Sequence, residues 1–377
     1  METKNPGANL AALRDHNAAV VLGLLRDAGE HGLSRAELAA GTGLTPQAVS
    51  KIAARLRDAG FAAEAGRRAS TGGKPAVALR LVRDAAHAVG VALDRDAMTV
   101  TVVDLAGTAV ATRTAPLDLG AGAEAVLSAV TAEVRALPSA GGRVLGVGVT
   151  APGPLDHARG VLGRVTGFPE WEGFPLRDAL AARLRAAGGE PGLVVLDKDT
   201  NAAALRLAAP APRTGGSFAY LHLGSGLGAG LVLDGAVHRG ARTNAGEFGH
   251  QVVQLDGPPC ACGNRGCVEV LCLRAVAEGD TARAARLLGV AAGNLVRLLD
   301  VDHLVLGGRT VLADPEAYAA GVREGTGAAV PVEVTPAGER TVVEGAAELV
   351  LARLFRRPGA GLATRADDRT IPISSGN

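Results

Sequence analysis

The segment from Glu247 to Glu269 constrains this chain most, because it gathers three of the four cysteines and one histidine into a short stretch. The four side chains are His250, Cys260, Cys262 and Cys267. Imidazole nitrogen and thiolate sulfur are the ligands that tetrahedral zinc prefers, and one His with three Cys leaves no open position for catalysis. Cysteines clustered in a chain otherwise nearly free of them indicate a metal rather than disulfides. We therefore predict a structural zinc ion, against the alternative of unrelated thiols buried as small apolar groups, which is how we interpret Cys272.

The chain is long enough for two or three domains, with 377 residues of which 47% are hydrophobic. It contains no long uncharged apolar run, so we expect no membrane span. Its N-terminus is polar, so we expect no signal peptide. The expected compartment is the reducing cytoplasm, which suits zinc-bound thiolates.

The net charge is +1 overall but is unevenly distributed. Residues 1–83 carry 12 Lys and Arg against 7 Asp and Glu, whereas the remainder carries 27 against 31. A basic N-terminal block on an acidic body indicates that a nucleic acid binds at one end of the molecule.

The N-terminal block has the element order of a helix-turn-helix. Residues 13–28 predict an amphipathic helix with its apolar positions on one face. A capping box at 34–37 starts a second helix, which a glycine turn at 41–44 ends. Thr45 then caps a third helix. A short helix, a glycine turn and a following helix make the motif, although an ordinary three-helix bundle shares each feature singly.

The predicted contacts with DNA lie on the third helix and on a hairpin that follows it. In a helix-turn-helix, the N-terminal residues of the second helix of the pair enter the major groove. Residues 61–81 predict a hairpin with a basic, glycine-rich tip, a wing whose cations contact phosphates or the minor groove. The predicted DNA-binding residues are Gln47, Ser50 and Lys51 on the helix and Arg67, Arg68 and Lys74 on the wing. The order of these elements, three helices with a turn before the third and then a basic hairpin, favours a winged helix-turn-helix over a three-helix bundle with a solvated loop.

The body alternates strands and helices, which predicts an α/β fold. Two β-rich runs at 88–93 and 98–103 are joined by a short turn and predict a hairpin. A second hairpin starts at Ser217 and turns through the glycines of Gly224–Gly230. Two hairpin-led units in series predict a duplicated fold with a cleft between two lobes. The glycines either form a nest for an anion or make a tight turn between strands, and spacing alone does not separate the two.

We expect four segments in the chain. Residues 1–83 form the DNA-binding domain, and residues 84–200 form the first lobe, which a C-terminal helix at 345–360 completes. Residues 201–344 form the second lobe with the zinc loop, and residues 361–377 form a disordered tail.

Together these features resemble the ROK family of repressors and sugar kinases, over nearly the whole chain. The family's pattern Glu-x-Gly-His…Cys-x-Cys-Gly-x-x-Gly-Cys-x-Glu is matched at every named position between Glu247 and Glu269. Residues 34–39 and 72–75 are similar to the repressor branch, whereas kinases of the family lack the N-terminal block. The resemblance implies a winged helix-turn-helix followed by a two-lobed actin-like ATPase body, the duplicated ribonuclease-H-like fold.

The resemblance also implies a sugar site in the cleft. Asp199 matches the base that acts on a sugar hydroxyl in the kinases, and Glu247 and Glu269 match carboxylates that accept hydrogen bonds from hydroxyls. His250 matches a residue that binds zinc through one ring nitrogen and donates to the sugar from the other. Lys198 stands where the family usually has Asn, and its ammonium would favour a ligand carboxylate or lower the pKa of Asp199. Two simpler alternatives stay open: Asp199 as a helix N-cap, and Glu247 as a solvated surface carboxylate.

The turn that cradles ATP phosphate in the family's kinases is degenerate here. Those kinases carry Asp-x-Gly-Gly-Thr, whereas this chain has Asp94-Arg95-Asp96-Ala97. The glycines are gone, and the second carboxylate would repel phosphate. We therefore predict no catalytic residue and no enzyme activity.

The sequence thus predicts a sugar-responsive transcriptional repressor. It would bind palindromic operator DNA as a homodimer or homotetramer, and a sugar or sugar derivative bound in the interlobe cleft would release it. Two alternatives stay open. One is an ATP-dependent sugar kinase with an added DNA-binding domain, in which Asp199 is the base, and the other is a repressor controlled by a protein partner.

Overall fold

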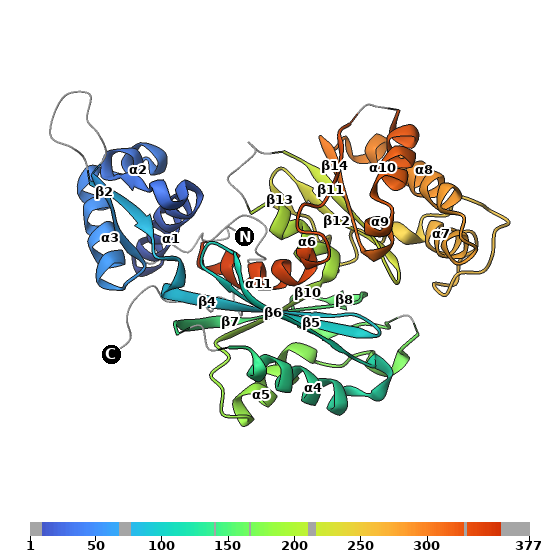
Figure 1. Ribbon diagram of the computed structural model, residues 1–377, viewed down its shortest axis with the longest axis horizontal. Helices are drawn as coiled ribbons and strands as arrows, with labels where there is room; N and C mark the ends of the chain where they lie inside the picture. The colour runs from blue at the N-terminus through green and yellow to red at the C-terminus, as the bar shows by residue number, and fades with distance from the viewer. Residues whose placement is uncertain are drawn as a thin grey trace, which may run out of the picture.

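A computed structural model describes residues 10–67, 77–138, 141–165, 167–209, 216–327 and 330–355. Figure 1 shows a small N-terminal part beside two larger α/β halves, with helices between the halves. The N-terminal part contains α1 (Leu10–Ala28), β1 (Leu33–Ser34), α2 (Arg35–Thr42), α3 (Pro46–Asp58), β2 (Ala62–Arg67) and β3 (Val77–Leu81). Across these described ranges, no helix combines the length and the apolar character needed to cross a membrane.

Local sequence signals set the ends of α2 and α3. The Ser34 hydroxyl accepts from the Glu37 backbone N–H at 3.2 Å, and the Glu37 carboxylate accepts from the Ser34 N–H at 2.7 Å, which is the predicted capping box. Gly43 ends α2 with a φ of 68°, in the left-handed region that glycine adopts without steric cost. Thr45 caps α3 by accepting from the Ala48 N–H at 3.3 Å. Beside these helices, β3 lies between β1 and β2 in an antiparallel sheet.

The first half of the body is built on a five-stranded sheet in the order β10-β7-β4-β5-β6. Its strands are β4 (Ala86–Leu93), β5 (Ala97–Asp104), β6 (Ala109–Pro116), β7 (Arg143–Ala151) and β10 (Leu193–Lys198), and the pair β8 (Leu155–Asp156) and β9 (Val161–Leu162) lies outside it. Strands β4, β5 and β6 run antiparallel, and β7 and β10 add to them in parallel. Helices α4 (Ala123–Ala136) and α5 (Leu176–Ala186) cover one face.

The second half repeats this topology in the order β13-β12-β11-β14-β15. Its strands are β11 (Phe218–Leu223), β12 (Leu227–Leu233), β13 (Ala236–Val237), β14 (His303–Gly307) and β15 (Val332–Val334), and its helices are α7 (Val268–Ala277), α8 (Thr281–Leu299), α9 (Arg309–Ala313) and α10 (Pro315–Thr326). Three antiparallel strands are again followed by two parallel ones. This repeat confirms the predicted duplication of the α/β unit.

Two helices, α6 (Asp199–Leu207) and α11 (Arg340–Leu354), lie between the sheets and pack against each other (Figure 1). Helix α11 packs on β4 and β7, and α6 packs on β11 and β12. Glycine permits both approaches: a Cβ on Gly148 of β7 would collide with the Ala346 carbonyl oxygen, and one on Gly230 of β12 would collide with that of Thr200. Helix α6 is thereby held between the two halves.

The closing helix begins earlier than the predicted 345–360. It starts at Arg340 and is described as far as Leu354. The β-branched residues Thr341 and Val343 have modest helix propensity, but each is only 1% exposed, so burial in the core overrides local preference. The predicted tail at 361–377 lies outside the described residues.

The N-terminal part is fixed to the body through α1 and α11. Arg26 of α1 forms a bidentate ion pair with Glu348 of α11, with N···O distances of 2.8 and 2.7 Å. The two side chains are 5% and 0% exposed. The guanidinium also donates to the Ala106 carbonyl and lies 4.8 Å from the centre of the Phe355 ring. One hydrophobic cluster contains residues of α1, β4 and α11, so the N-terminal part shares a core with the body.

Candidate metal centre and interlobe site

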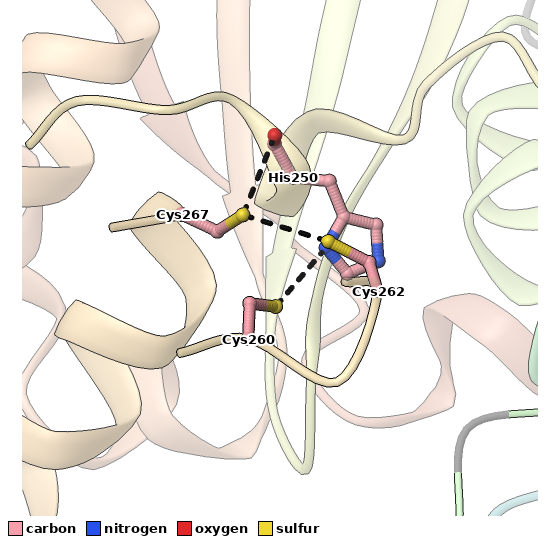
Figure 2. Close-up of side chains that lie close together, drawn as sticks. All are labelled: His250, Cys260, Cys262 and Cys267. Carbon is pink, nitrogen blue, oxygen red and sulfur yellow. Dashed lines mark hydrogen bonds between the residues drawn. The ribbon is translucent and has the colours of Figure 1, made fainter. Parts of the chain in front are cut away.

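The predicted metal ligands come together in one cluster, shown in Figure 2. The cluster consists of His250, Cys260, Cys262 and Cys267, whose ligand atoms all lie within 4.8 Å of one another. Cys260 Sγ is 3.7 Å from Nδ1 of His250, and the sulfur atoms of Cys262 and Cys267 are 3.6 Å apart. A tetrahedral ion with metal–sulfur bonds of about 2.3 Å separates two sulfur ligands by about 3.7 Å. The donor set and its spacing therefore fit a tetrahedral metal ion.

The loop that carries the cysteines is shaped by short turns. The Cys260 N–H donates to the Asn264 carbonyl at 2.8 Å, and the Gly263 N–H donates to the Cys260 carbonyl at 3.0 Å. Gly263 and Gly266 have φ values of 95° and 64°, which side chains disfavour. Cys267 then occupies the N-cap position of α7. A turn and a helix start thus hold the three thiols in place.

Lys198 and Glu247 join the two halves of the body. Lys198 ends β10, and its ammonium lies 3.0 Å from Oε1 of Glu247 and donates to the Ala245 carbonyl at 2.7 Å. The Lys198 side chain is 3% exposed and that of Glu247 is 37% exposed. Glu247 is therefore a carboxylate that is ion-paired with a buried ammonium and still exposed to solvent, and its role in binding a ligand stays a prediction.

Asp199 is the first residue of α6, after Lys198 at the N-cap position. Its Oδ1 accepts from the Thr200 N–H at 2.6 Å. Burial raises the pKa of Asp199 above its usual value, and His222 and Lys198 offset this only in part. Lys198 does lower the pKa of Asp199, as predicted, but desolvation outweighs the nearby ammonium and the net shift is upward. Asp199 is therefore a better proton acceptor than an ordinary aspartate.

The remaining predicted ligand-binding residues lie on the second half. Glu269 is in the first turn of α7, and its Oε2 accepts from the Leu227 N–H at 2.8 Å, at the start of β12. His250 ends the short 3-10 helix η5 (Phe248–His250), directly after Glu247. One carboxylate oxygen of Glu269 is thus committed to the backbone. Lys198 and Asp199 thus follow the first half, Glu247, His250 and Glu269 belong to the second, and the Lys198–Glu247 ion pair links the two groups.

Sequence reasoning missed a buried ionic network beside this site. Asp197 is 0% exposed, lies 2.7 Å from an Arg239 nitrogen and accepts from the Asn201 amide at 2.9 Å. Nδ1 of His157 is 3.6 Å from the same carboxylate. Burial opposes ionisation of Asp197, but Arg239 and His157 outweigh it and hold the pKa of Asp197 below its usual value. The sequence offered only one signal for this network, an Asp two residues before Asp199. The cation that pairs with Asp197 is Arg239, which lies 42 positions away in the chain.

The turn between β4 and β5 contacts the second half. Asp94 accepts from the Ser225 hydroxyl at 2.9 Å, and Asp96 lies 3.4 Å from an Arg309 nitrogen. Both contacts bridge the halves, one to the turn after β11 and one to α9. This turn therefore presents carboxylates to the space between the halves.

The glycines of Gly224–Gly230 do not form one loop. The turn is confined to Gly224–Gly226, because β12 begins at Leu227. The later glycines belong to the strand, where Gly230 makes room for α6. The tight-turn alternative describes the geometry of Gly224–Gly226, and anion binding at this turn stays a prediction.

The predicted DNA-contacting residues of α3 lie on its exposed side. Those residues are Gln47, Ser50 and Lys51, whereas Val49, Ala53 and Leu56 on the other side are buried. The hairpin of β2 and β3 has the predicted antiparallel pairing. The side chain of Arg67, and all of Arg68 and Lys74, lie outside the described part of the chain.

Comparison with known proteins gives one family. The sequence model of the ROK family matches residues 88–278, just over half of the chain. The xylose repressor of Caldicellulosiruptor bescii is 27% identical over 271 residues, which cover 69% of this chain and 64% of that protein. The chain therefore aligns with less than two thirds of the length of this curated relative.

Two solved structures are similar in fold. The ROK hexokinase of Thermus thermophilus is 31% identical with a TM-score of 0.57, and the match covers 70% of this chain and 97% of that one. A ROK family transcriptional regulator, described as a homologue of the Escherichia coli MLC protein, has a TM-score of 0.73 at 20% identity, covering 91% of this chain and 97% of its own. The match to the regulator thus covers about a fifth more of this chain than the match to the hexokinase does.

Proposed function

Because this chain belongs to the ROK family, we propose that it is a sugar-responsive transcriptional repressor. It binds operator DNA through its N-terminal part and is released by a sugar or sugar derivative bound between the two halves of the body. The observation that carries the proposal is α3, which follows a turn after α2 and presents polar and basic side chains to solvent. The match to the regulator covers 91% of this chain, against 70% for the match to the hexokinase.

We interpret residues 1–83 as a winged helix-turn-helix. Helix α2, the turn at Gly43 and helix α3 have the order of the motif, and the hairpin of β2 and β3 follows in the position of a wing. The exposed residues at the start of α3 are Gln47, Ser50 and Lys51. Such residues contact base edges in helix-turn-helix proteins. Cations of the wing, from Arg67, Arg68 and Lys74, would contact phosphates. The broader match to the regulator supports this interpretation.

The effector site is proposed at the cluster of Lys198, Asp199, Glu247, His250 and Glu269. Ionised carboxylates accept hydrogen bonds, and a polyol supplies hydroxyl donors to them. The Lys198–Glu247 pair neutralises one carboxylate and draws the two halves together. A ligand that binds here would therefore favour the closed arrangement of the halves. The similarity to a protein named xylose repressor supports a sugar as the class of effector.

We propose that the body is not a kinase. A nucleotide phosphate near the turn at 94–97 would meet the carboxylates of Asp94 and Asp96, and like charges repel. Both carboxylates already contact the second half, through Ser225 and Arg309. The turn lacks the glycines whose N–H groups wrap phosphate.

The cluster of one His and three Cys is proposed to bind a structural zinc ion. Four protein ligands leave no open position, so the metal supplies folding free energy rather than chemistry. His250 follows Glu247 by three residues and Cys267 precedes Glu269 by two, so the metal would also fix the segments that carry both carboxylates.

A route from the effector to DNA runs through two helices. Helix α6 begins at Asp199 and packs on α11, and α11 carries Glu348, the partner of Arg26 in α1. A ligand changes DNA affinity only when it binds the two forms of the protein unequally. Palindromic operators reflect two-fold protein symmetry, so the working form is proposed to be a homodimer or homotetramer.

Operator affinity measured with and without a panel of sugars tests the function. The DNA is a fragment selected for binding from a random library. The cognate sugar should weaken binding by about 5- to 150-fold, the range of typical couplings. Glu247→Gln should bind DNA normally but lose the response. Glu316→Gln is the matched control, because Glu316 is 85% exposed on α10 and pairs with Arg323.

Other results point to the alternatives. Sugar-dependent ADP formation that Asp199→Asn abolishes would establish a kinase with an added DNA-binding domain. DNA binding without a response to any sugar or derivative would favour control by a protein partner. Absence of any selected DNA would refute the proposed function.

A further inference from the structure

A segment of the second half is bound to the end of β10 in the first half. This segment, residues 239–247, lies between β13 and η5, and we call it the clasp segment. Arg239 lies 2.7 Å from the carboxylate of Asp197, which is 0% exposed. The Thr243 hydroxyl accepts from the His157 N–H at 3.1 Å, and both of these residues are buried. The clasp segment is therefore held to the first half at two buried points.

Lys198 holds the clasp segment at a third point and reaches Glu247 at its end. The ammonium donates to the Ala245 carbonyl at 2.7 Å and lies 3.0 Å from Oε1 of Glu247. A Cβ added to Gly153 would lie 3.0 Å from Cδ of Lys198 and 3.6 Å from Oε1 of Glu247, so the Gly153 backbone covers the pair closely. The Lys198 side chain is 3% exposed. Two of its three N–H groups thus have acceptors in the second half, and little of its surface is open to a ligand.

Glu247 differs from its partner in exposure. Its side chain is 37% exposed, whereas the ammonium that holds Oε1 is buried. A charge-assisted hydrogen bond to a buried cation is strong and fixes the carboxylate in one orientation. The second oxygen, Oε2, is then presented in that orientation. An acceptor that is already ordered loses less conformational freedom when a ligand hydroxyl donates to it.

The other carboxylates of the proposed effector site are not paired with Lys198. Asp199 follows Lys198 directly, and Glu269 accepts from the Leu227 N–H through one oxygen. Ionised carboxylates repel a ligand acid. They accept hydrogen bonds from the hydroxyl groups of a polyol. A buried ammonium that is committed to Glu247 does not reverse this preference.

We propose that Lys198 is a positioning residue, which fixes Glu247 and the clasp segment for an uncharged polyol. This inference rests on the proposed function. Lys198 acts through Glu247 and makes no contact with a ligand acid. The class of effector is then a neutral sugar rather than a sugar acid.

Hydrogen exchange of the full chain, without ligand or DNA, tests the positioning role. The probe is the Ala245 amide, which donates to the Arg239 carbonyl within the clasp segment. Lys198→Met keeps the buried stem but removes the charge, so this amide should exchange about ten-fold faster. Lys198→Arg keeps a cation that can pair with Glu247 and should restore most of the protection.

Arg113→Met is the matched control for exchange. Arg113 pairs with Glu133 at 2.9 Å, and both residues belong to the first half, so its loss should leave the clasp segment unchanged. Unchanged exchange in Lys198→Met would overturn the positioning role. Equal exchange in Lys198→Met and Lys198→Arg would show that the stem, and not the charge, holds the segment.

Calorimetry of the wild-type chain tests the class of effector. The probes are xylose with xylonate and glucose with glucuronate. In the pair that binds, the uncharged sugar should bind at least about ten-fold more tightly than the acid. Tighter binding of the acid would overturn the proposal, because it would place a ligand acid on Lys198. If none of the four binds, the proposed effector class fails, whereas hydrogen exchange still decides the positioning role.

A double-variant cycle tests whether Lys198 acts through Glu247. Lys198→Met should weaken binding of the sugar by about ten-fold in the wild-type chain. In a Glu247→Gln background the same change should weaken it by less than about three-fold, because the effects of interacting residues are not additive. Equal losses in the two backgrounds would contradict a role that passes through Glu247.

Discussion

Two aspartates at the end of β10 respond to burial in opposite ways. Asp197 is fully buried, but Arg239 at 2.7 Å keeps it ionised, with a pKa below the usual value. Asp199, two residues later, has a raised pKa because burial outweighs the nearby Lys198 and His222. One carboxylate therefore stabilises the fold at neutral pH, and the other costs folding free energy and remains available to a ligand.

Substitution of these aspartates should have opposite effects on stability. Asp197→Asn removes the buried carboxylate that lies 2.7 Å from Arg239 and should lower the free energy of unfolding by about 3–5 kcal/mol. Asp199→Asn removes a partly buried carboxylate whose ionisation burial opposes, and it should raise the midpoint of thermal unfolding at neutral pH. Thermal unfolding of both variants beside the wild type measures this. A loss of stability in Asp199→Asn would contradict the raised pKa.

The pH dependence follows from the sign of each shift. The raised pKa of Asp199 means that its ionised form costs stability at neutral pH and that this cost disappears as the pH falls below the native pKa. The gain in thermal stability of Asp199→Asn over the wild type should therefore become smaller as the pH is lowered. The lowered pKa of Asp197 has the reverse consequence: its contribution is present above the unfolded pKa of about 3.9 and is lost as the pH falls through the native pKa.

At the scale of elements, α11 carries the contact that positions the N-terminal part. Its Glu348 is 0% exposed and is paired with Arg26 of α1. The charges of a buried ion pair contribute little net stability, because desolvation offsets their attraction. Removal of one partner is destabilising, because it leaves the other charge buried and unpaired. The pair therefore specifies how the N-terminal part sits on the body.

Arg26→Met should lower the free energy of unfolding by about 3–5 kcal/mol, because it leaves Glu348 buried and unpaired. The double variant Arg26→Met/Glu348→Leu should recover most of that loss while weakening the effect of sugar on DNA binding. Arg57→Met is the control, since the Arg57–Glu64 pair is 41% and 56% exposed and should contribute less than about 1 kcal/mol. A double variant with an unchanged sugar response would remove α11 from the proposed route.

The loop of His250 and the three cysteines is a second element with a testable role. Cys262→Ser should lose bound zinc and much of the soluble folded protein, because metal binding contributes folding free energy. Cys272→Ser changes the remaining cysteine, which is 0% exposed beside the Ala284 carbonyl and outside the cluster, and it should keep about one zinc per chain. Elemental analysis of the purified proteins distinguishes these outcomes. Wild-type protein without zinc would contradict the assignment.

At the scale of the whole molecule, the uneven charge places a basic part at one end. Lys51→Ala should weaken operator binding and reduce the slope of log affinity against log salt by about one, as the loss of one phosphate contact requires. Arg57→Ala at the end of α3 should leave the slope unchanged, because Arg57 pairs with Glu64. Gel-shift titrations at several salt concentrations measure both. An unchanged slope in Lys51→Ala would mean that this face of α3 does not contact phosphate.

Much of the architecture followed from local sequence signals. The capping box at Ser34, the cap at Thr45 and the two hairpin patterns depend on neighbours in the chain, and each was found where expected. The grouping of His250 with the three cysteines also followed from spacing, because thiols so close in sequence have few other reasons to cluster. Predictions of this kind succeed when the interaction spans a few residues.

The tertiary structure decided the interactions that join distant segments. Arg26 meets Glu348 across 322 positions, Asp197 meets Arg239 across 42, and no local pattern encodes either pairing. The net pKa of Asp199 likewise depends on how completely the fold removes water from it, which the identity of its neighbour Lys198 does not reveal. Local sequence determined which chemical groups this protein has and where the capped helices α2 and α3 begin. Burial and long-range pairing, which depend on the packed chain as a whole, determined where α11 begins and how the buried groups behave.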